Sequence, residues 1–417
     1  MKHKFLSVIF LLVSSGLCAQ TWVQKTNFPE QTLSGRWSPY AFVLNNKIYS
    51  GGGYVGNLTS RRDLWEYDVS NNTWIQKQNV PGSSNRTAAI AFSINGKGYV
   101  GLGMQNYNTL STTFLNDLKE YDPVTNTWTS KASLPDSGRG DAACFVVNDK
   151  AYVVGGLTGY PELASNDVWM YDASADQWTP LQAFPADFIY NAISFTANSN
   201  GYVVGGRLKN NSSSSSFTSK FMYQYNALAD IWTQKADYCD TSGRENGIAF
   251  VVNNNAYVGT GQAHVGSILY YYREFCVYNI LTDTWAQAPD FPATDRAYAV
   301  AVSVNNKAYA GTGFLYNSAE IYFNDWWEFS EPAGISNVDE EMQTLLFPNP
   351  AFETINIVSG MRDILYYSIF DCFGNQVASG RTSASGDISI SSLPGGMYFI
   401  HLFNDKISYK KAFQKFR

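Results

Sequence analysis

The sequence contains few of the residues on which metal and redox chemistry depends. Histidine occurs three times in 417 residues, at His3, His264 and His401. One histidine in the long middle of the chain cannot supply a multi-histidine metal centre, and no Cys-x-x-Cys pair offers other ligands. A Gly-x-Ser-x-Gly nucleophile turn and a glycine-rich phosphate loop are also missing. We therefore expect no metal and no cofactor.

Charged residues and long apolar runs are scarce as well. Only 15% of the residues are charged and the net charge is −6, which gives no electrostatic reason to expect nucleic acid as a partner. After residue 19 no apolar stretch is long enough to cross a bilayer, so we expect no transmembrane segment. Aromatic residues reach 16% and there are 33 glycines, a composition typical of an all-β chain.

Residues 1–19 have the pattern of a secretory signal peptide. Two lysines precede an apolar run over residues 5–17, and Ala19 offers a small residue for cleavage. An alternative is a lipoprotein acylated at Cys18, which fits poorly because a bulky leucine precedes that cysteine. We expect export into the periplasm and a mature chain that begins at Gln20.

The middle of the chain consists of six copies of one unit. Tryptophan recurs every 50 to 54 residues, at Trp22, Trp74, Trp128, Trp178, Trp232 and Trp285, and a tyrosine precedes the last five of these by seven residues. A second tyrosine series has an asparagine four residues before it and a glycine four residues after it, at Tyr49, Tyr99, Tyr152, Tyr202, Tyr257 and Tyr309. A period near 50 residues indicates propeller blades.

Each unit predicts four short strands. An asparagine such as Asn45 stands in the first hairpin turn, where it tolerates the positive φ that a tight turn requires. The sixth unit lacks its outer tryptophan, because Ser336 occupies that position, whereas residues 21–25 carry Trp22 outside any complete unit. We therefore expect the N-terminal strand to complete the sixth blade and remove an open sheet edge.

With these features the chain resembles the kelch-repeat propellers, whose blades carry an arginine near the first strand, a Gly-Gly after the second, and spaced tyrosine and tryptophan. The resemblance covers residues 20–330 and implies an all-β fold, a six-bladed kelch-type β-propeller closed by an N-terminal strand. The double glycine is adjacent only in some blades, as at Gly155-Gly156, and Cys276 stands where the first blade has Trp65. A WD-type propeller is disfavoured because its period is only about 40 to 45 residues.

The repeat stops near residue 330. Residues 331–345 predict a linker, and alternating strands over residues 346–417 predict a small C-terminal β-sandwich. The Phe-Pro-Asn-Pro run at residues 347–350 and the Gly-Gly-Met-Tyr run at residues 395–398 resemble the C-terminal sorting domain of type IX secretion in Bacteroidetes.

That second resemblance implies that the type IX secretion machinery recognises the tail as a partner. It also implies passage through the periplasm and delivery to the outer cell surface or the medium. The alternative is an ordinary β-sandwich binding module with a chance Asn-Pro turn, since sandwiches recur without shared function.

Four cysteines remain in the mature chain, and export permits disulfides. Cys144 falls where other blades have small residues, which predicts a small core side chain. Cys239 and Cys276 belong to the approach and the third strand of one blade, so they could pair, although no spacing pattern recommends a disulfide. The fourth is Cys372.

Five of the six blades carry an arginine thirteen residues before the second-strand tyrosine, at Arg36, Arg86, Arg139, Arg244 and Arg296, whereas the remaining blade has Ile189. The entry of the innermost strand should lie at one mouth of the central channel. One interpretation is a cationic collar that binds a carboxylate or an acidic sugar. The other, which we favour because the arginine is part of the repeat, is that each guanidinium ties neighbouring blades together.

The connection between the second and third strands varies most in length, from 14 to 19 residues between the repeat glycine and the third-strand tyrosine. Variable loops on one face of a repeat scaffold usually carry binding. Their aromatic residues include Tyr54, Tyr107, Tyr160 and Tyr316. These rings suit a glycan or peptide ligand, or they pack between blades.

We expect a monomeric, secreted or surface-exposed propeller that binds a glycan or protein ligand and is not an enzyme. Some kelch propellers resemble galactose oxidase, whose copper centre needs two histidines, and the single propeller histidine excludes that chemistry. The alternative is a carbohydrate-active isomerase similar to the kelch-type sialate epimerases. Its acid and base groups would come from the long loops, where Glu162, Glu274, Arg207 and His264 are candidates.

Overall fold

The computed structural model divides the chain into two compact units, Met1–Pro332 and Ala333–Arg417. It describes residues 21–30, 35–56, 59–82, 85–107, 111–159, 163–209, 215–331, 345–347, 351–358, 366–371, 375–382, 387–403 and 408–416. The expected signal peptide and nearly all of the expected linker lie outside these residues. Every regular element in the described part is a β-strand, and no helix there could span a membrane.

Six four-stranded antiparallel sheets make up the first unit. Five of them follow the chain order, and we number them as blades one to five. Blade one consists of β2 (Tyr40–Leu44), β3 (Lys47–Gly51), β4 (Leu64–Asp68) and β5 (Thr73–Lys77), and blade two of β6 (Ile90–Ile94), β7 (Lys97–Gly101), β10 (Leu118–Asp122) and β11 (Thr127–Lys131). Blade three consists of β12 (Ala143–Val147), β13 (Lys150–Gly159), β14 (Leu163–Asp172) and β15 (Gln177–Leu181), blade four of β17 (Ile193–Ala197), β18 (Asn200–Val204), β21 (Met222–Asn226) and β22 (Ile231–Lys235), and blade five of β23 (Ile248–Val252), β24 (Asn255–Gly259), β27 (Phe275–Asn279) and β28 (Thr284–Ala288). The sixth blade joins β29 (Val300–Val304), β30 (Lys307–Gly311) and β33 (Trp326–Ser330) to β1 (Thr21–Lys25).

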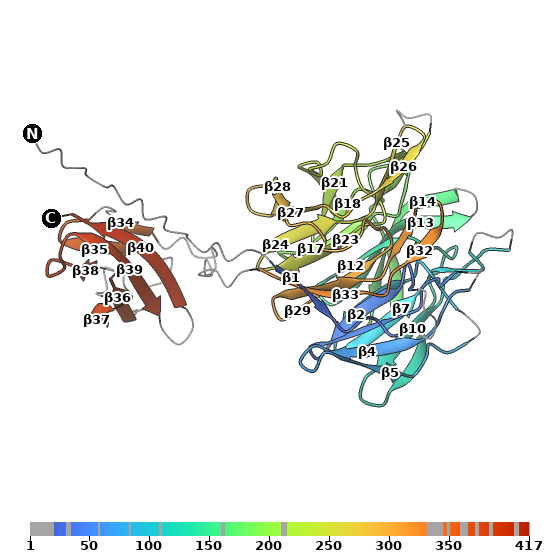
Figure 1. The fold of residues 1–417 in the computed structure, drawn as a ribbon, viewed down its shortest axis with the longest axis horizontal. Coiled ribbons are helices and arrows are strands. Elements are labelled where there is room, and N and C mark those ends of the chain that lie inside the picture. The colour runs from blue at the N-terminus through green and yellow to red at the C-terminus, as the bar shows by residue number, and fades with distance from the viewer. Residues whose placement is uncertain are drawn as a thin grey trace, which may run out of the picture. The chain divides into compact units, whose positions relative to one another are not determined.

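The first strands of the six sheets lie around one axis. β2 packs against β6, β6 against β12, β12 against β17, β17 against β23, β23 against β29, and β29 against β2. Because this series of contacts returns to its start, the inner strands form a closed ring. The outer strand of the sixth blade is β1, which pairs antiparallel with β33, so the blue β1 lies beside the orange β33 in Figure 1.

The hairpin turns have the backbone that the asparagines predict. In the first blade Asn45 and Asn46 adopt φ of 50° and 60°, and the first turn residue of every other blade is also an asparagine with positive φ. The repeat glycine after the second strand is required for a different reason. At Gly53 the φ is 82°, and an added Cβ would lie 2.7 Å from the Trp37 carbonyl oxygen.

The repeat tyrosine, the turn and the tryptophan join each blade to its neighbour. The Tyr67 hydroxyl donates to Asn72 Oδ1 (2.7 Å), and the same oxygen accepts the backbone N–H of Thr26 (2.8 Å), which follows β1. Trp74 Nε1 donates to the Thr26 carbonyl (3.0 Å). The same three contacts recur at the next four seams, where the accepting turn residues are Asn126, Asp176, Asp230 and Asp283.

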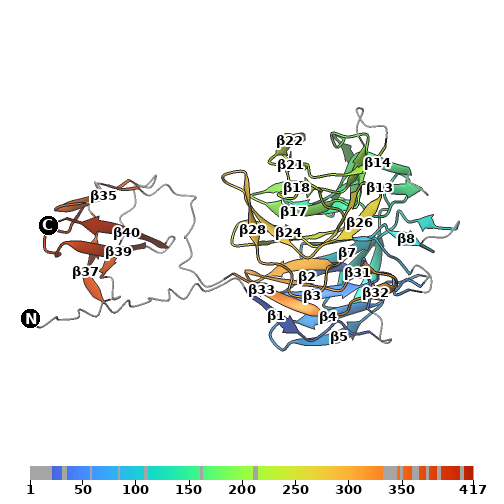
Figure 2. The same cartoon turned by 45° about the horizontal axis from the view of Figure 1, so that its top comes forward.

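The variable connections form short strands of their own. They are β8 (Met104–Gln105), β9 (Thr113–Phe114), β19 (Arg207–Lys209), β20 (Phe217–Thr218), β25 (Gln262–Val265), β26 (Ile268–Tyr271), β31 (Phe314–Tyr316) and β32 (Glu320–Tyr322). β16 (Phe188–Tyr190) precedes the first strand of the fourth blade and pairs with β19. Figures 1 and 2 show the β25–β26 hairpin, β32 and the extended ends of β13 and β14 on the same side of the propeller. Length variation in the sequence therefore corresponds to added strands on one face.

The second unit contains two antiparallel sheets, as expected for a small sandwich. One joins β34 (Leu345–Phe347), β35 (Thr354–Val358) and β38 (Asp387–Ser389), and the other joins β36 (Tyr366–Phe370), β37 (Gln376–Arg381), β39 (Gly396–Phe403) and β40 (Ser408–Lys415). Ile355 and Ile388 of the first sheet share one core with Ile369, Ile400 and Phe413 of the second.

One disulfide joins Cys239 to Cys276 in the fifth blade. Cys276 belongs to β27, and Cys239 belongs to the segment that enters the blade, so the bond ties a connecting segment to a strand. Cys144 is a free thiol that packs at the edge of the core, where burial raises its pKa to about 12 and keeps it protonated. Cys372 lies outside the described residues.

Candidate functional site

The repeat arginines lie inside the blades. All five side chains are no more than 1% exposed. In the second blade Arg86 donates Nη1 and Nη2 to the two carboxylate oxygens of Asp117 (3.0 and 2.9 Å), and Nη1 also reaches the Leu102 carbonyl (3.1 Å). Three other blades repeat this arrangement with Arg36 on Asp63, Arg139 on Asp167 and Arg296 on Asp325.

Two blades replace the arginine–aspartate pair. In the fourth blade Ile189 and Phe221 stand at the two positions and pack in one apolar cluster. In the fifth blade Arg244 donates to Asp240 (2.8 Å) and lies over the Tyr272 ring, 3.6 Å from its centre.

These contacts favour the structural interpretation of the repeat arginines over an open cationic collar, but the aspartates that they bind belong to the same blade and not to a neighbouring one. The guanidinium groups are enclosed, and in four blades an aspartate and a backbone carbonyl already take their donors. Burial opposes ionisation of Asp167, but the hydrogen bonds and charge of Arg139 outweigh it and lower the pKa of that carboxyl to about 2. A neutralised, buried pair attracts an anionic ligand weakly, so the position has a structural role.

A second set of six residues, each two positions after the repeat arginine or Ile189, lines the mouth itself. We call it the axial ring: Ser38, Ala88, Asp141, Asn191, Asn246 and Tyr298. Each adopts a left-handed backbone with φ between 51° and 58°. Backbone hydrogen bonds of 2.8 to 3.1 Å link them around the axis, from Ser38 to Tyr298, Tyr298 to Asn246, Asn246 to Asn191, Asn191 to Asp141, and Asp141 to Ala88. Left-handed backbone at an alanine and a tyrosine is strained, and such strain concentrates at functional sites.

The closed ring brings ionisable side chains of separate blades within electrostatic reach of one another. Burial first, and then the charge of Glu245 in the fifth blade, raise the pKa of Asp141 in the third blade to about 7. Burial and the nearby Tyr107, Asp141 and Glu245 raise the pKa of Tyr298 in the sixth blade well above its ordinary value. The third blade is next to neither the fifth nor the sixth, so Asp141 acts on Glu245 and Tyr298 across the axis.

In each blade, the residue that immediately precedes the axial-ring residue forms an antiparallel backbone pair with the first residue of the variable connection in the same blade. These pairs are Trp37 with Tyr54, Thr87 with Met104, Gly140 with Leu157, Tyr190 with Arg207, Glu245 with Gln262, and Ala297 with Phe314. We call the axial ring and these pairs together the axial mouth. Its charged and amide residues come from the third to fifth blades, and most of its aromatic residues come from the sixth and first.

The aromatic side is centred on Trp37. Its ring lies 4.4 Å from that of Tyr298, 5.0 Å from Tyr107 and 5.5 Å from Tyr54, measured between ring centres. Tyr54 and Tyr107 thus pack with rings of neighbouring blades beside the axial ring, which fits the packing alternative for the loop aromatics. Tyr316 lies in β31 with 58% of its surface exposed. Tyr160 lies outside the described residues.

The polar side contains a contact between three ionisable groups. His264 Nδ1 lies 3.0 Å from Glu245 Oε1 and 2.9 Å from Arg207 Nη1, and Arg207 Nη1 lies 3.9 Å from the same carboxylate oxygen. The structure thus joins two of the four expected acid–base candidates to Glu245. Glu274 does not join them, because it lies with Arg273 and Asp295 in another hollow. Glu162 lies outside the described residues.

Several polar atoms of the mouth lack a hydrogen-bond partner in the described part of the chain. They include Asn191 Oδ1, Asn246 Nδ2 and Gln262 Oε1. Asn246 is only 9% exposed and Gln262 only 6%. Buried polar atoms without partners are costly, and a ligand could satisfy these three, which makes the axial mouth the candidate site.

We predict that Asp141→Asn stabilises the protein at high pH. A carboxyl whose pKa is about 7 when folded and about 4 when unfolded loses folding free energy as the pH rises through that window. Asparagine removes this loss and tolerates the positive φ. Thermal unfolding should show little difference at pH 4 and a melting temperature higher by about 3 °C or more at pH 8. Equal gains at both pH values would contradict the assigned ionisation.

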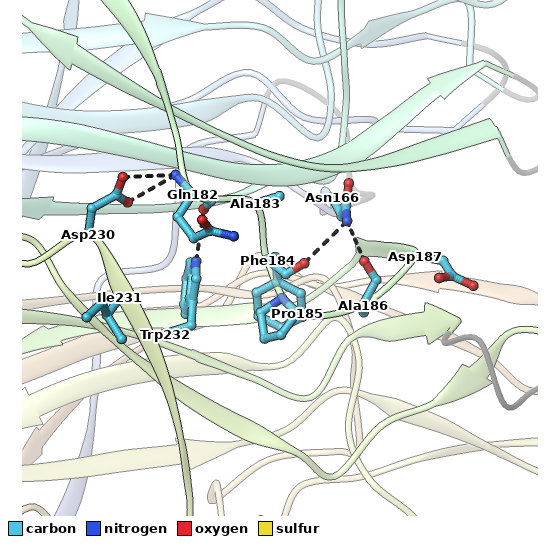
Figure 3. A pocket seen from close by; sticks show the side chains of 10 residues that line it. All are labelled: Asn166, Gln182, Ala183, Phe184, Pro185, Ala186, Asp187, Asp230, Ile231 and Trp232. Atoms are coloured by element: carbon cyan, nitrogen blue, oxygen red, sulfur yellow. Dashed lines mark hydrogen bonds between the residues drawn. The ribbon is translucent and has the colours of Figure 1, made fainter.

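A hollow of about 850 Å³ lies elsewhere, on the seam between the third and fourth blades, where Figure 3 shows the ten lining side chains. Its polar groups already bond one another: Trp232 Nε1 donates to the Gln182 carbonyl (3.2 Å), and Asn166 Nδ2 donates to that of Phe184 (3.3 Å). These are the seam contacts of the repeat, so this hollow is a weaker candidate than the axial mouth.

Sequence comparisons agree with this architecture. The KLHDC2/KLHL20/DRC7 Kelch-repeats domain matches residues 3–156, and the Kelch motif matches residues 138–185. The Secretion system C-terminal sorting domain matches residues 345–415. The chain carries kelch repeats and a C-terminal sorting domain. Both resemblances drawn from the sequence are confirmed.

Relatives of the kelch propeller include sugar-modifying enzymes. The N-acetylneuraminate epimerase of Shigella sonnei (strain Ss046) is 34% identical and epimerase 2 of Escherichia coli O6:H1 is 28% identical, each over 155 residues. Each match covers 37% of this chain and 39% of the relative, so the chain spans about two fifths of their length. The solved structure of YjhT matches with a TM-score of 0.61 and 18% identity over 72% of this chain and 95% of its own, which shows the fold alone.

Sequence reasoning missed Asp141, Asn191, Glu245, Asn246 and Tyr298. A signal was present, because the six units differ from one another at the two positions that follow the repeat arginine. Variation at a fixed place in a regular scaffold is what a ligand site produces.

Proposed function

We propose that the kelch propeller is a secreted or surface-exposed module that binds a glycan in the axial mouth. The observation that carries this proposal is an aromatic wall around Trp37 facing amide and carboxylate groups across a strained ring. Sugars present apolar faces that stack on aromatic rings, and hydroxyls that need convergent hydrogen-bond partners. The sorting domain supports delivery to the cell surface or the medium, with type IX transit through the periplasm as the proposed route.

The test is a glycan array probed with the mature chain, followed by calorimetry on each hit. Asn246→Gly keeps the positive φ but removes the unpartnered amide, so we expect about a tenfold loss of affinity with the fold intact. Asn45→Gly is the matched control, because it makes the same change at a hairpin turn. If both variants bound every hit with equal affinity, the glycan would not bind at the axial mouth.

A second candidate is a sugar isomerase that opens and recloses a ring at the same mouth. Ring opening needs one group to accept a proton and another to donate one. Asp141, with its pKa raised to about 7 by burial and the charge of Glu245, is suited to exchange protons near neutral pH. The names of the relatives support this candidate. Magnetisation-transfer NMR would measure the exchange between the anomers of a bound sugar. Faster exchange with the protein than without it would establish the isomerase, and an unchanged rate would leave binding as the only proposed function.

The sorting domain predicts a transferable signal. Residues Ala333–Arg417 form a compact unit, so their fusion to an unrelated periplasmic protein should deliver it to the surface of a host with type IX secretion. The matched control lacks β40, whose Phe413 belongs to the sandwich core. Retention of the complete fusion in the periplasm, measured by protease accessibility on intact cells, would contradict the assignment.

A further inference from the structure

The charges of the axial mouth favour one class of sugar. Its ionisable side chains in the described residues include two carboxylates, Asp141 and Glu245, and one arginine, Arg207. Arg207 already has partners. Its Nη1 lies 3.9 Å from Glu245 Oε1 and 2.9 Å from His264 Nδ1, and its Nε donates a hydrogen bond to Ser216 Oγ (3.1 Å). The repeat arginines are enclosed in the blades.

Asp141 is the group without a partner. No ion pair or hydrogen bond of its carboxylate exists with any described residue, and it is only partly exposed. Its neighbours Asn191 and Asn246 also hold unpartnered amide atoms, and Asn246 is 9% exposed. A desolvated carboxylate without a cation is unfavourable, so a positive group on a ligand would be stabilised there.

We propose that the axial mouth takes an amino sugar, whose ammonium group pairs with Asp141, and that it rejects carboxylated sugars. This inference rests on the proposed glycan-binding function. The ammonium supplies the cation that the protein lacks, and it donates to Asn191 Oδ1 from the same position. A sugar carboxylate would instead bring a third negative charge beside Asp141 and Glu245, with no free guanidinium among the described mouth residues to meet it.

This selectivity differs from what the names of the relatives suggest, because N-acetylneuraminate is an acidic sugar. It also differs from the collar expected from the repeat arginines. In both cases the deciding observation is that Asp63, Asp117, Asp167 and Asp325 already neutralise four of the five arginines. The mouth is therefore negative where a carboxylate would need a cation.

The experiment measures calorimetric affinities of the mature chain for three matched methyl glycosides: glucosamine, glucose and glucuronic acid, with the galactose and mannose series in parallel. In at least one series we expect the amine to bind about tenfold more tightly than the neutral sugar, and the acid to bind weakest. Asp141→Asn should reduce the affinity for the amine to that for the neutral sugar.

Asp149→Asn is the matched control, because it removes an exposed carboxylate from the hairpin turn of the same blade, also at positive φ. It should keep the preference for the amine. Tightest binding of the acid, or equal binding of amine and neutral sugar, would overturn the inference and leave the glycan-binding proposal standing. Absence of binding in every series and on the glycan array would overturn both.

Discussion

Deletion of residues 21–25 is expected to abolish cooperative folding of the propeller. These residues form β1, which supplies all five backbone pairs on the outer side of β33. The deletion also removes Trp22, whose ring centre lies within 5.0 to 5.8 Å of the rings of Phe250, Phe275, Phe291 and Phe329. Trp22 is half-buried, so its loss alone should cost less than the about 3–5 kcal/mol of a fully buried tryptophan. The exposed edge of β33 would then invite pairing between chains.

Size-exclusion chromatography and near-ultraviolet circular dichroism would measure this outcome. Val23→Ala is a control on the same strand, because Val23 is 48% exposed and its truncation should change little. Trp22→Ala should lie between the two, with a folded chain of lower melting temperature. A monomeric deletion variant that unfolds cooperatively would show that the ring does not depend on its N-terminal strand.

The repeat was predictable because each of its residues makes the same contact in every blade. Tyr67, Asn72 and Trp74 illustrate this, since all three join two neighbouring blades and their counterparts recur along the chain. The sixth unit lacks this tryptophan, and the sequence therefore predicted that the strand carrying Trp22 completes the sixth blade. A contact that must be made at each seam leaves a periodic trace in the sequence.

The candidate site leaves no such trace. Asp141 and Glu245 belong to different blades and influence each other only because the ring is closed. Nothing in their separation of 104 positions in the sequence predicts that they face the same axis. The repeat arginines could be recognised in the sequence because they recur, and their recurrence indicated a structural role in each blade that carries one. The six positions of the axial ring share a backbone conformation but no residue type, and so escaped pattern analysis.

Replacement of Arg86 by isoleucine is expected to destabilise the propeller by about 3 kcal/mol, in the range measured when one partner of a buried ion pair is removed. The variant leaves Asp117 without its two hydrogen bonds from the guanidinium and leaves the Leu102 carbonyl without its side-chain donor. The aspartate then faces a buried apolar side chain. Denaturant unfolding of the mature chain measures the loss.

The fourth blade indicates how this loss can be reversed. There Ile189 and Phe221 occupy the positions of the arginine and the aspartate, and both belong to one apolar cluster. The double variant Arg86→Ile/Asp117→Phe should therefore recover at least half of the stability lost by Arg86→Ile, because no charge remains unpaired. Asp117→Phe alone leaves the Arg86 guanidinium buried without its carboxylate and should be as damaging as the isoleucine variant. Losses that simply add in the double variant would mean that the two positions do not act as a pair. Recovery would establish that the repeat arginine is a structural residue of the blade, which leaves ligand recognition to the axial mouth.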